Sequence, residues 1–245
     1  MDTLTLAAIT AAAGFAGFTQ GFAGFGSTLV ALPLLGMVLD VRTAVPVCCL
    51  MALVVNIVLV ARLHPHIQRG ALGWLIVASL PGMAVGAWML GIAPEGLLKG
   101  LLGASVLLVV MHSLRVSQPL APSRKEWLAL AGFLAGCLGV CIGINGPPVV
   151  AWAARQAWSR NALKATLTSY FLLAGIGIVG VQAANGLVTN HVLLLSAVAM
   201  PALAAGLWAG GAYCGRLSDR AFRRCVLALL AVTGATLLGQ VLAGA

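Results

Sequence analysis

Long apolar runs separated by short polar connections make up most of this chain. Six uninterrupted runs each reach about the 20 residues that a helix needs to cross a bilayer. They are Thr43 to Ala61, Ala71 to Leu90, Gly96 to Leu114, Asn161 to Ala184, His191 to Gly211 and Cys225 to Ala243. The pattern therefore predicts an all-α integral membrane protein that crosses the bilayer several times.

Two further apolar segments are interrupted by short stretches rich in glycine and proline. The first break is Gly21-Phe22-Ala23-Gly24-Phe25-Gly26-Ser27, between Leu4 to Gln20 and Ser27 to Leu39. The second is Gly143-Ile144-Asn145-Gly146-Pro147-Pro148, between Trp127 to Gly139 and Pro147 to Trp158. Each part is shorter than the hydrocarbon core, about 30 Å thick, so each segment is one kinked crossing or a hairpin of two short helices. Because a break at membrane depth must be buried in protein or line a cavity, both breaks are candidate ligand sites.

The placement of lysine and arginine favours hairpins, because cytoplasmic connections are enriched in these residues. Single crossings would divide the 14 cations five against nine between the two sides of the membrane. Hairpins leave only Arg42 and Lys99 on one side and collect the other twelve on the cytoplasmic side. This arrangement predicts that both termini face outside. It also predicts two inverted repeats, residues 1–116 and 127–245, which form one transport domain and are joined by a cytoplasmic linker, residues 117–126.

Composition excludes several classes of protein. With 61% hydrophobic and 8% charged residues, the chain cannot present an ordinary soluble surface. The net charge of +9 lies in short connections and forms no continuous basic face, so a nucleic-acid partner is not expected. No acid pair, nucleophile with a base, metal-ligand cluster or cofactor motif occurs in the spans, which argues against an enzyme. All five acidic residues lie at span ends or in loops, so no carboxylate relay is expected across the membrane.

The two breaks favour an anion as the ligand. We expect Ser27 or Thr28 to cap the helix that restarts after Gly26, and Asn145 to cap the helix that restarts at Pro147. Free N–H groups and the positive dipole ends of these helices attract negative charge. The tips Gly24 to Thr28 and Asn145 to Pro148 are predicted to converge near the membrane midplane. Alternatively, the glycines serve close helix packing, the role expected of Gly82-x-x-x-Gly86, Gly132-x-x-x-Gly136 and Gly206-x-x-x-Gly210.

Other polar residues within the spans complete the predicted site. Asn56 either faces the cavity or makes a plain hydrogen bond between helices. Thr168 and Ser169 border the site of the second half in the hairpin arrangement. The predicted substrate-binding residues are Gly24, Gly26, Ser27, Thr28, Asn56, Asn145, Gly146, Pro147, Thr168 and Ser169.

The motifs around the breaks resemble those of the sulfite exporter TauE/SafE family of bacterial membrane permeases. The resemblance rests on Gly21-x-x-Gly24-x-Gly26-Ser27 followed by Pro33, and on Gly136-x-x-Gly139-x-x-x-Gly143-x-Asn145-Gly146-Pro147-Pro148. It implies transport of sulfite, sulfonates or small organic acids. Cys48-Cys49 stand where family members often carry a Thr-Ser pair, whereas Thr168-Ser169 retain hydroxyls in the second half.

The leading interpretation is a secondary transporter of the inner membrane that exports small sulfur-containing or organic anions by alternating access. An anion channel and a transporter of unrelated small carboxylates are the alternatives. The expected partners are the anionic substrate and the lipid bilayer, a homodimer is left open, and no cofactor is expected.

Overall fold

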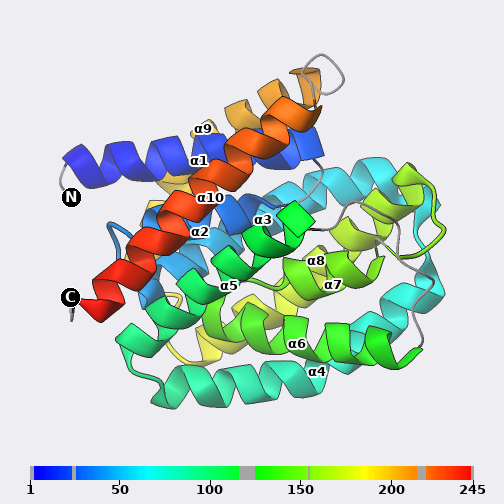
Figure 1. Cartoon of the computed structure of the whole chain (residues 1–245), viewed down its shortest axis with the longest axis horizontal. Coiled ribbons are helices and arrows are strands. Elements are labelled where there is room, and N and C mark those ends of the chain that lie inside the picture. Colours follow the sequence, from blue (N-terminus) through cyan, green and yellow to red (C-terminus); the bar gives the residue numbers. More distant parts are fainter. Residues whose placement is uncertain (1–2, 24–25, 116–124, 154, 214–218, 244–245) are drawn as a thin grey trace. The chain divides into compact units, whose positions relative to one another are not determined.

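A computed structural model describes residues 3–23, 26–115, 125–153, 155–213 and 219–243. These residues form ten α-helices and one short 3-10 helix (Figure 1). The α-helices are α1 (Thr3–Ala23), α2 (Ser27–Leu35), α3 (Val41–Leu63), α4 (Arg69–Ile92), α5 (Glu95–Arg115), α6 (Lys125–Ile142), α7 (Gly146–Ala153), α8 (Arg160–Ala184), α9 (Asn190–Tyr213) and α10 (Asp219–Leu242), and η1 (His64–His66) is the 3-10 helix.

Each predicted apolar run forms one helix, and each predicted break separates two helices. Among the described residues, α3, α4, α8 and α9 each contain a stretch long and apolar enough to cross a membrane. The short helices end earlier than predicted: α2 stops at Leu35 and α7 at Ala153. The all-helical membrane class is therefore confirmed.

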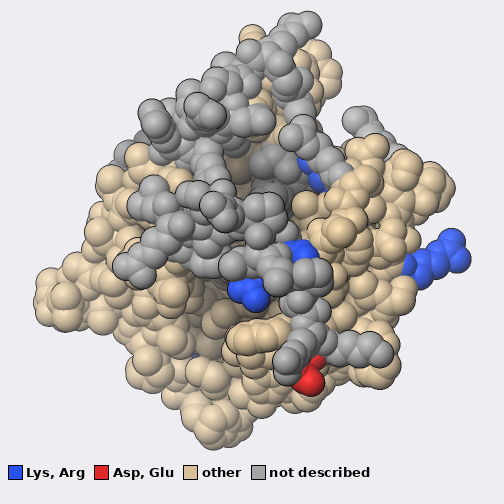
Figure 2. Space-filling view, turned by 45° about the vertical axis from the view of Figure 1, so that its right-hand side comes forward, with Lys and Arg blue, Asp and Glu red and all other residues tan. Residues whose placement is uncertain are grey.

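Among the described residues on the surface shown in Figure 2, few side chains are lysine, arginine, aspartate or glutamate. Several large apolar side chains are also exposed, including those of Trp74, Trp88 and Trp208. Exposed apolar surface on this scale suits contact with lipid rather than water.

The described helices divide into two compact units that combine segments from both predicted repeats. One unit consists of Met1–Met51, Ala93–Ser117 and Asn190–Ala245, and the other of Ala52–Ile92 and Gln118–Thr189. The division into repeats follows chain order and stays a prediction. Residues 117–124 of the predicted linker lie outside the described part of the chain.

In the first unit, α1 packs against α9 through glycines. A β-carbon added at Gly206 would overlap the carbonyl oxygen of Gly14, and one added at Gly210 would overlap that of Phe18. Only glycine permits backbones to approach so closely. The same close approach occurs from the side of α1, where Gly17 and Gly21 meet the carbonyl oxygens of Leu203 and Leu207.

In the second unit, α4 packs against α6 in the same manner. A β-carbon at Gly82 would overlap the carbonyl oxygen of Phe133, and one at Gly86 would overlap that of Cys137. Figure 1 shows α4 and α6 side by side along their length. The packing role predicted for the three Gly-x-x-x-Gly pairs is therefore confirmed. The corresponding glycines of α6 are Gly132 and Gly136, which meet the carbonyl oxygens of Leu75 and Ser79.

The two helix pairs correspond to each other along the chain. The long helices of the two hairpins are α1 and α6. Each packs against the middle one of the three long helices of the other predicted repeat, α1 against α9 and α6 against α4. The distance in sequence from Gly17 to Gly136 equals the distance in sequence from Ser27, the first residue of α2, to Gly146, the first residue of α7. This correspondence is what two repeats would produce, while their inverted orientation stays a prediction.

The ends of the second broken segment lie close together. The Arg155 guanidinium carbon, just beyond α7, lies 5.9 Å from the ring centre of Trp127 in the first turn of α6. A straight crossing would hold these ends apart by the length of both helices. The contact therefore favours a hairpin that enters and returns at one end.

Cysteine accessibility tests the topology in intact cells. In a cysteine-free background, we expect Glu126→Cys and Ala157→Cys to label from the cytoplasm. Asn185→Cys should label from outside, because α8 crosses the membrane between Ala157 and Asn185. All three native side chains are exposed. Labelling of Glu126→Cys and Ala157→Cys from opposite sides would exclude the second hairpin.

Candidate functional site

The tip of the second hairpin is formed by the residues between α6 and α7. Gly143 has a φ of 71°, in the left-handed region that glycine adopts readily. Its N–H donates to the carbonyl oxygen of Gly139 at 3.0 Å, which closes the end of α6. Asn145 lies directly before α7, which begins at Gly146. The break is thus a turn that starts a new helix.

This tip packs against α8. A β-carbon added at Gly139 would lie 2.6 Å from Ile178 Cδ1 and 3.0 Å from the β-carbon of Asn145. A β-carbon added at Gly146 would lie 3.8 Å from Phe171 Cζ. Phe171 and Ile178 are about two turns apart on one face of α8. That face therefore contacts both the end of α6 and the beginning of α7.

Thr168 lies close to this contact face. It precedes Phe171 by about one turn, and its side chain is fully buried. Its hydroxyl has no hydrogen-bond partner among the described residues, and neither does the buried hydroxyl of Ser169. Because 3.6 residues complete one turn of a helix, the side chain of Ser169 points about 100° away from that of Thr168 around α8. Of this predicted pair, Thr168 is the residue on the hairpin side.

Trp152 in α7 is a buried polar residue that the sequence analysis missed. Its indole Nε1 is buried and has no partner in the described part of the chain. The ring of Trp158 meets the Trp152 ring edge-on, with centroids 5.5 Å apart. A tryptophan in an apolar run is normally interpreted as a packing residue. Its position in the short helix after the break could have marked it as a site residue, since a buried indole N–H usually finds an acceptor.

The tip of the first hairpin differs from the prediction. Gly26, with a φ of 100°, is the N-cap residue of α2, and it has no side chain that could cap the helix. The prediction that Ser27 or Thr28 caps α2 is wrong, because Ser27 is already the first helical residue, whereas a cap lies before the helix. Instead, the Ser27 N–H donates to Gln20 Oε1 at 2.9 Å. An anion at this tip would compete with Gln20, and Gly24 lies outside the described residues.

Asn56 is buried on α3, in the unit that also contains α6, α7 and α8. Its side chain is not free, since it already takes part in an interaction. Both sequence-based interpretations of Asn56 therefore stay open.

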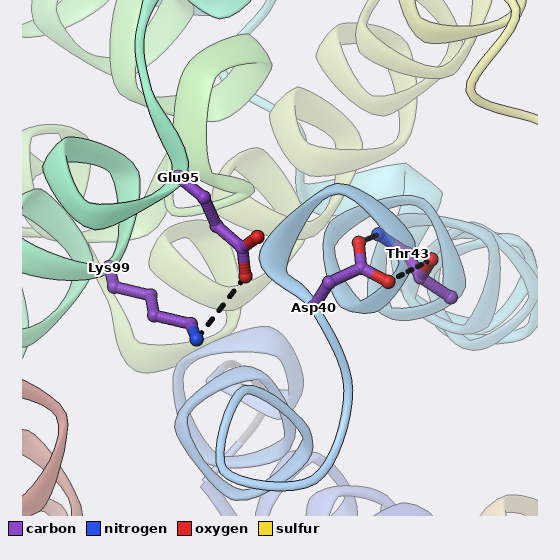
Figure 3. Close-up of polar contacts among 4 residues, drawn as sticks. All are labelled: Asp40, Thr43, Glu95 and Lys99. Carbon is purple, nitrogen blue, oxygen red and sulfur yellow. Dashed lines mark hydrogen bonds and ion pairs between the residues drawn. The ribbon is translucent and has the colours of Figure 1, made fainter. Parts of the chain in front are cut away.

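An open hollow of about 330 Å³ lies elsewhere, in the first unit. Figure 3 shows that Lys99 forms an ion pair with Glu95, at 3.2 Å, and that the Asp40 carboxylate accepts two hydrogen bonds from Thr43, both at 2.8 Å. Two carboxylates and a neutralised cation make the hollow a poor anion site. None of the predicted substrate-binding residues lines it. The lining residues are Gly36, Met37, Val38, Leu39, Asp40, Glu95, Lys99 and Gln240.

The two cations predicted on the outer side are both partnered. Lys99 pairs with Glu95, and Arg42 Nη2 donates to the carbonyl oxygen of Ala93 at 3.1 Å. The described acidic residues Asp40, Glu95 and Glu126 are exposed and lie at or next to helix ends, as predicted.

Comparison with known proteins identifies the family. The family model described as Sulfite exporter TauE/SafE matches residues 9–237, which run from α1 to α10 and include both breaks. No curated protein and no solved structure matches the chain. The chain therefore belongs to the sulfite exporter TauE/SafE family, whose members are membrane permeases of sulfite-like anions.

Proposed function

We propose that this protein is a secondary transporter that exports small sulfur oxyanions or sulfonates across the inner membrane by alternating access. The observation that carries the proposal is the second hairpin tip. There, α7 begins next to Asn145 and packs on α8 at Phe171, about one turn from the buried Thr168, whose hydroxyl has no partner among the described residues.

The first turn of α7 has few donors, and they suit a weak ligand. The N–H positions that a helix start leaves without an intrahelical partner run from the N-cap to the third helical residue, and Pro147 and Pro148 lack an N–H group, so Asn145 and Gly146 are the residues that can donate there. A helix N-terminus contributes about 0.3–1 kcal/mol to an exposed charge and up to about 2 kcal/mol when partly buried. A transported anion must leave again, so modest attraction at this point is an advantage.

Transport into liposomes that contain the purified protein tests this proposal. Thr168→Val keeps the shape of the side chain and removes its hydroxyl. We expect it to lower the efficiency of sulfite transport about 10- to 100-fold, the loss typical of one hydrogen bond to a charged group. Gly146→Val should act in the same direction by filling the space in front of the α7 N–H groups.

Thr236→Val on α10 is the matched control. The Thr236 hydroxyl is exposed and already donates to the carbonyl oxygen of Val232 at 2.9 Å, so its loss should leave transport unchanged. Wild-type transport by Thr168→Val would contradict the site. Flux that does not saturate would indicate a channel, and flux of acetate without sulfite would indicate a carboxylate transporter.

A further inference from the structure

The indole N–H of Trp152 is a buried donor without an acceptor in the described part of the chain. The side chain is 7% exposed, and Nε1 has no hydrogen-bond partner among the described residues. An indole N–H donates only and cannot accept, so a neighbouring donor does not satisfy it. Within a membrane protein such a group is costly unless a ligand or a water molecule accepts its hydrogen bond.

The position of this N–H relates it to the tip of the second hairpin. Val149, Trp152 and Ala153 are the buried residues of α7, and their spacing places them on one face of the helix. Trp152 therefore follows Val149 by about one turn on the same face. The edge-on contact with Trp158, with an interplanar angle of 77°, holds the indole ring.

A positive charge that attracts anions lies at the base of the same hairpin, where α6 begins and α7 ends. The Arg155 guanidinium lies over the Trp127 ring, and no ion pair of Arg155 with a carboxylate occurs in the described part of the chain. Its positive charge is therefore not neutralised by a described acidic residue. Donors therefore occur at the first turn of α7 and at Trp152, and the Arg155 cation follows just beyond the helix.

From this arrangement we infer that Trp152 Nε1 donates a hydrogen bond to the transported anion between the hairpin tip and its base. The inference rests on the proposed function and adds a binding residue to it. The ligand class is an oxyanion with several acceptor oxygens, such as sulfite or a sulfonate, because one oxygen can bind the indole while others bind hydroxyl or N–H groups.

Nuclear magnetic resonance of indole ¹⁵N-labelled protein in detergent tests the contact directly. The chain contains six tryptophans, so six indole N–H signals are expected, and Trp152→Phe identifies one by its loss. We expect that signal to move when sulfite or methanesulfonate is added to the wild type. Trp152→Phe keeps an aromatic ring beside Trp158, and it should weaken sulfite binding about 10- to 100-fold.

Trp208→Phe serves as the control, because Trp208 is 78% exposed on α9, and its sulfite affinity should equal that of the wild type. If Trp152→Phe does not fold, single replacements of the other five tryptophans still identify the Trp152 signal by elimination. An unmoved Trp152 signal in protein that binds sulfite would overturn this inference and leave the proposed function intact. A wild type that responds neither to sulfite nor to methanesulfonate would overturn both.

Discussion

Replacing Gly210 of α9 by leucine is expected to destabilise the folded protein by about 3 kcal/mol or more, beyond the usual cost of overpacking. A β-carbon at this position meets the backbone of Phe18 in α1, which cannot move aside as a side chain can. The two helices would have to separate along their shared face. Thermal unfolding of the purified protein in detergent measures the loss.

The adjacent residue provides the matched control. A β-carbon at Gly211 has no atom within 4 Å, and this position is exposed. Gly211→Leu should change stability by less than about 1 kcal/mol, because only helix propensity differs. In the second unit, Gly82→Leu and Gly91→Leu should form the same contrast on α4. Equal stability of Gly210→Leu and Gly211→Leu would contradict the close α1–α9 contact.

Replacing Gly143 by valine is expected to abolish the response to sulfite and to cost about 1–3 kcal/mol of stability. Gly143 has a φ of 71°, a conformation that β-branched residues rarely adopt. Relief of the strain requires the turn between α6 and α7 to change, which moves Asn145 and the start of α7. The stabilisation of the protein by sulfite in thermal unfolding reports the loss.

Gly180→Val on α8 is the control for this change. Gly180 is exposed, and an added β-carbon there has no atom within 4 Å. This variant should keep its response to sulfite and change stability by less than about 1 kcal/mol, because valine is a slightly better helix former than glycine. A Gly143→Val variant that responds to sulfite like the wild type would show that the turn is not required for binding.

The structure also separates two roles that glycine could have in this chain. Gly82, Gly86, Gly206 and Gly210 lie where two helix backbones touch, so they serve packing. Gly26 and Gly143 have positive φ values in the breaks, so they serve the turns. The proposal that the breaks merely assist packing therefore does not account for the second group.

The sequence alone determined which residues form helices and where the helices are interrupted. An apolar run such as Asn161 to Ala184 is long enough to cross a membrane, and α8 occupies nearly the same residues, Arg160–Ala184. The breaks were also predictable, because glycine and proline act on the backbone at their own positions. The packing of Gly82-x-x-x-Gly86 followed from small residues recurring at helical spacing.

Only the tertiary structure decided which segments meet. Helix α2 begins one residue earlier than local cap rules favoured, with Gly26 as its N-cap, and the Ser27 N–H donates to Gln20 Oε1 of α1 instead. The partners of the glycine helices, α9 for α1 and α6 for α4, come from distant parts of the chain, and apolar patterns of similar composition do not distinguish between candidates. That the Thr168 hydroxyl and the Trp152 indole N–H have no partner among the described residues likewise follows only from the structure, because burial and hydrogen-bond satisfaction depend on the surrounding packing.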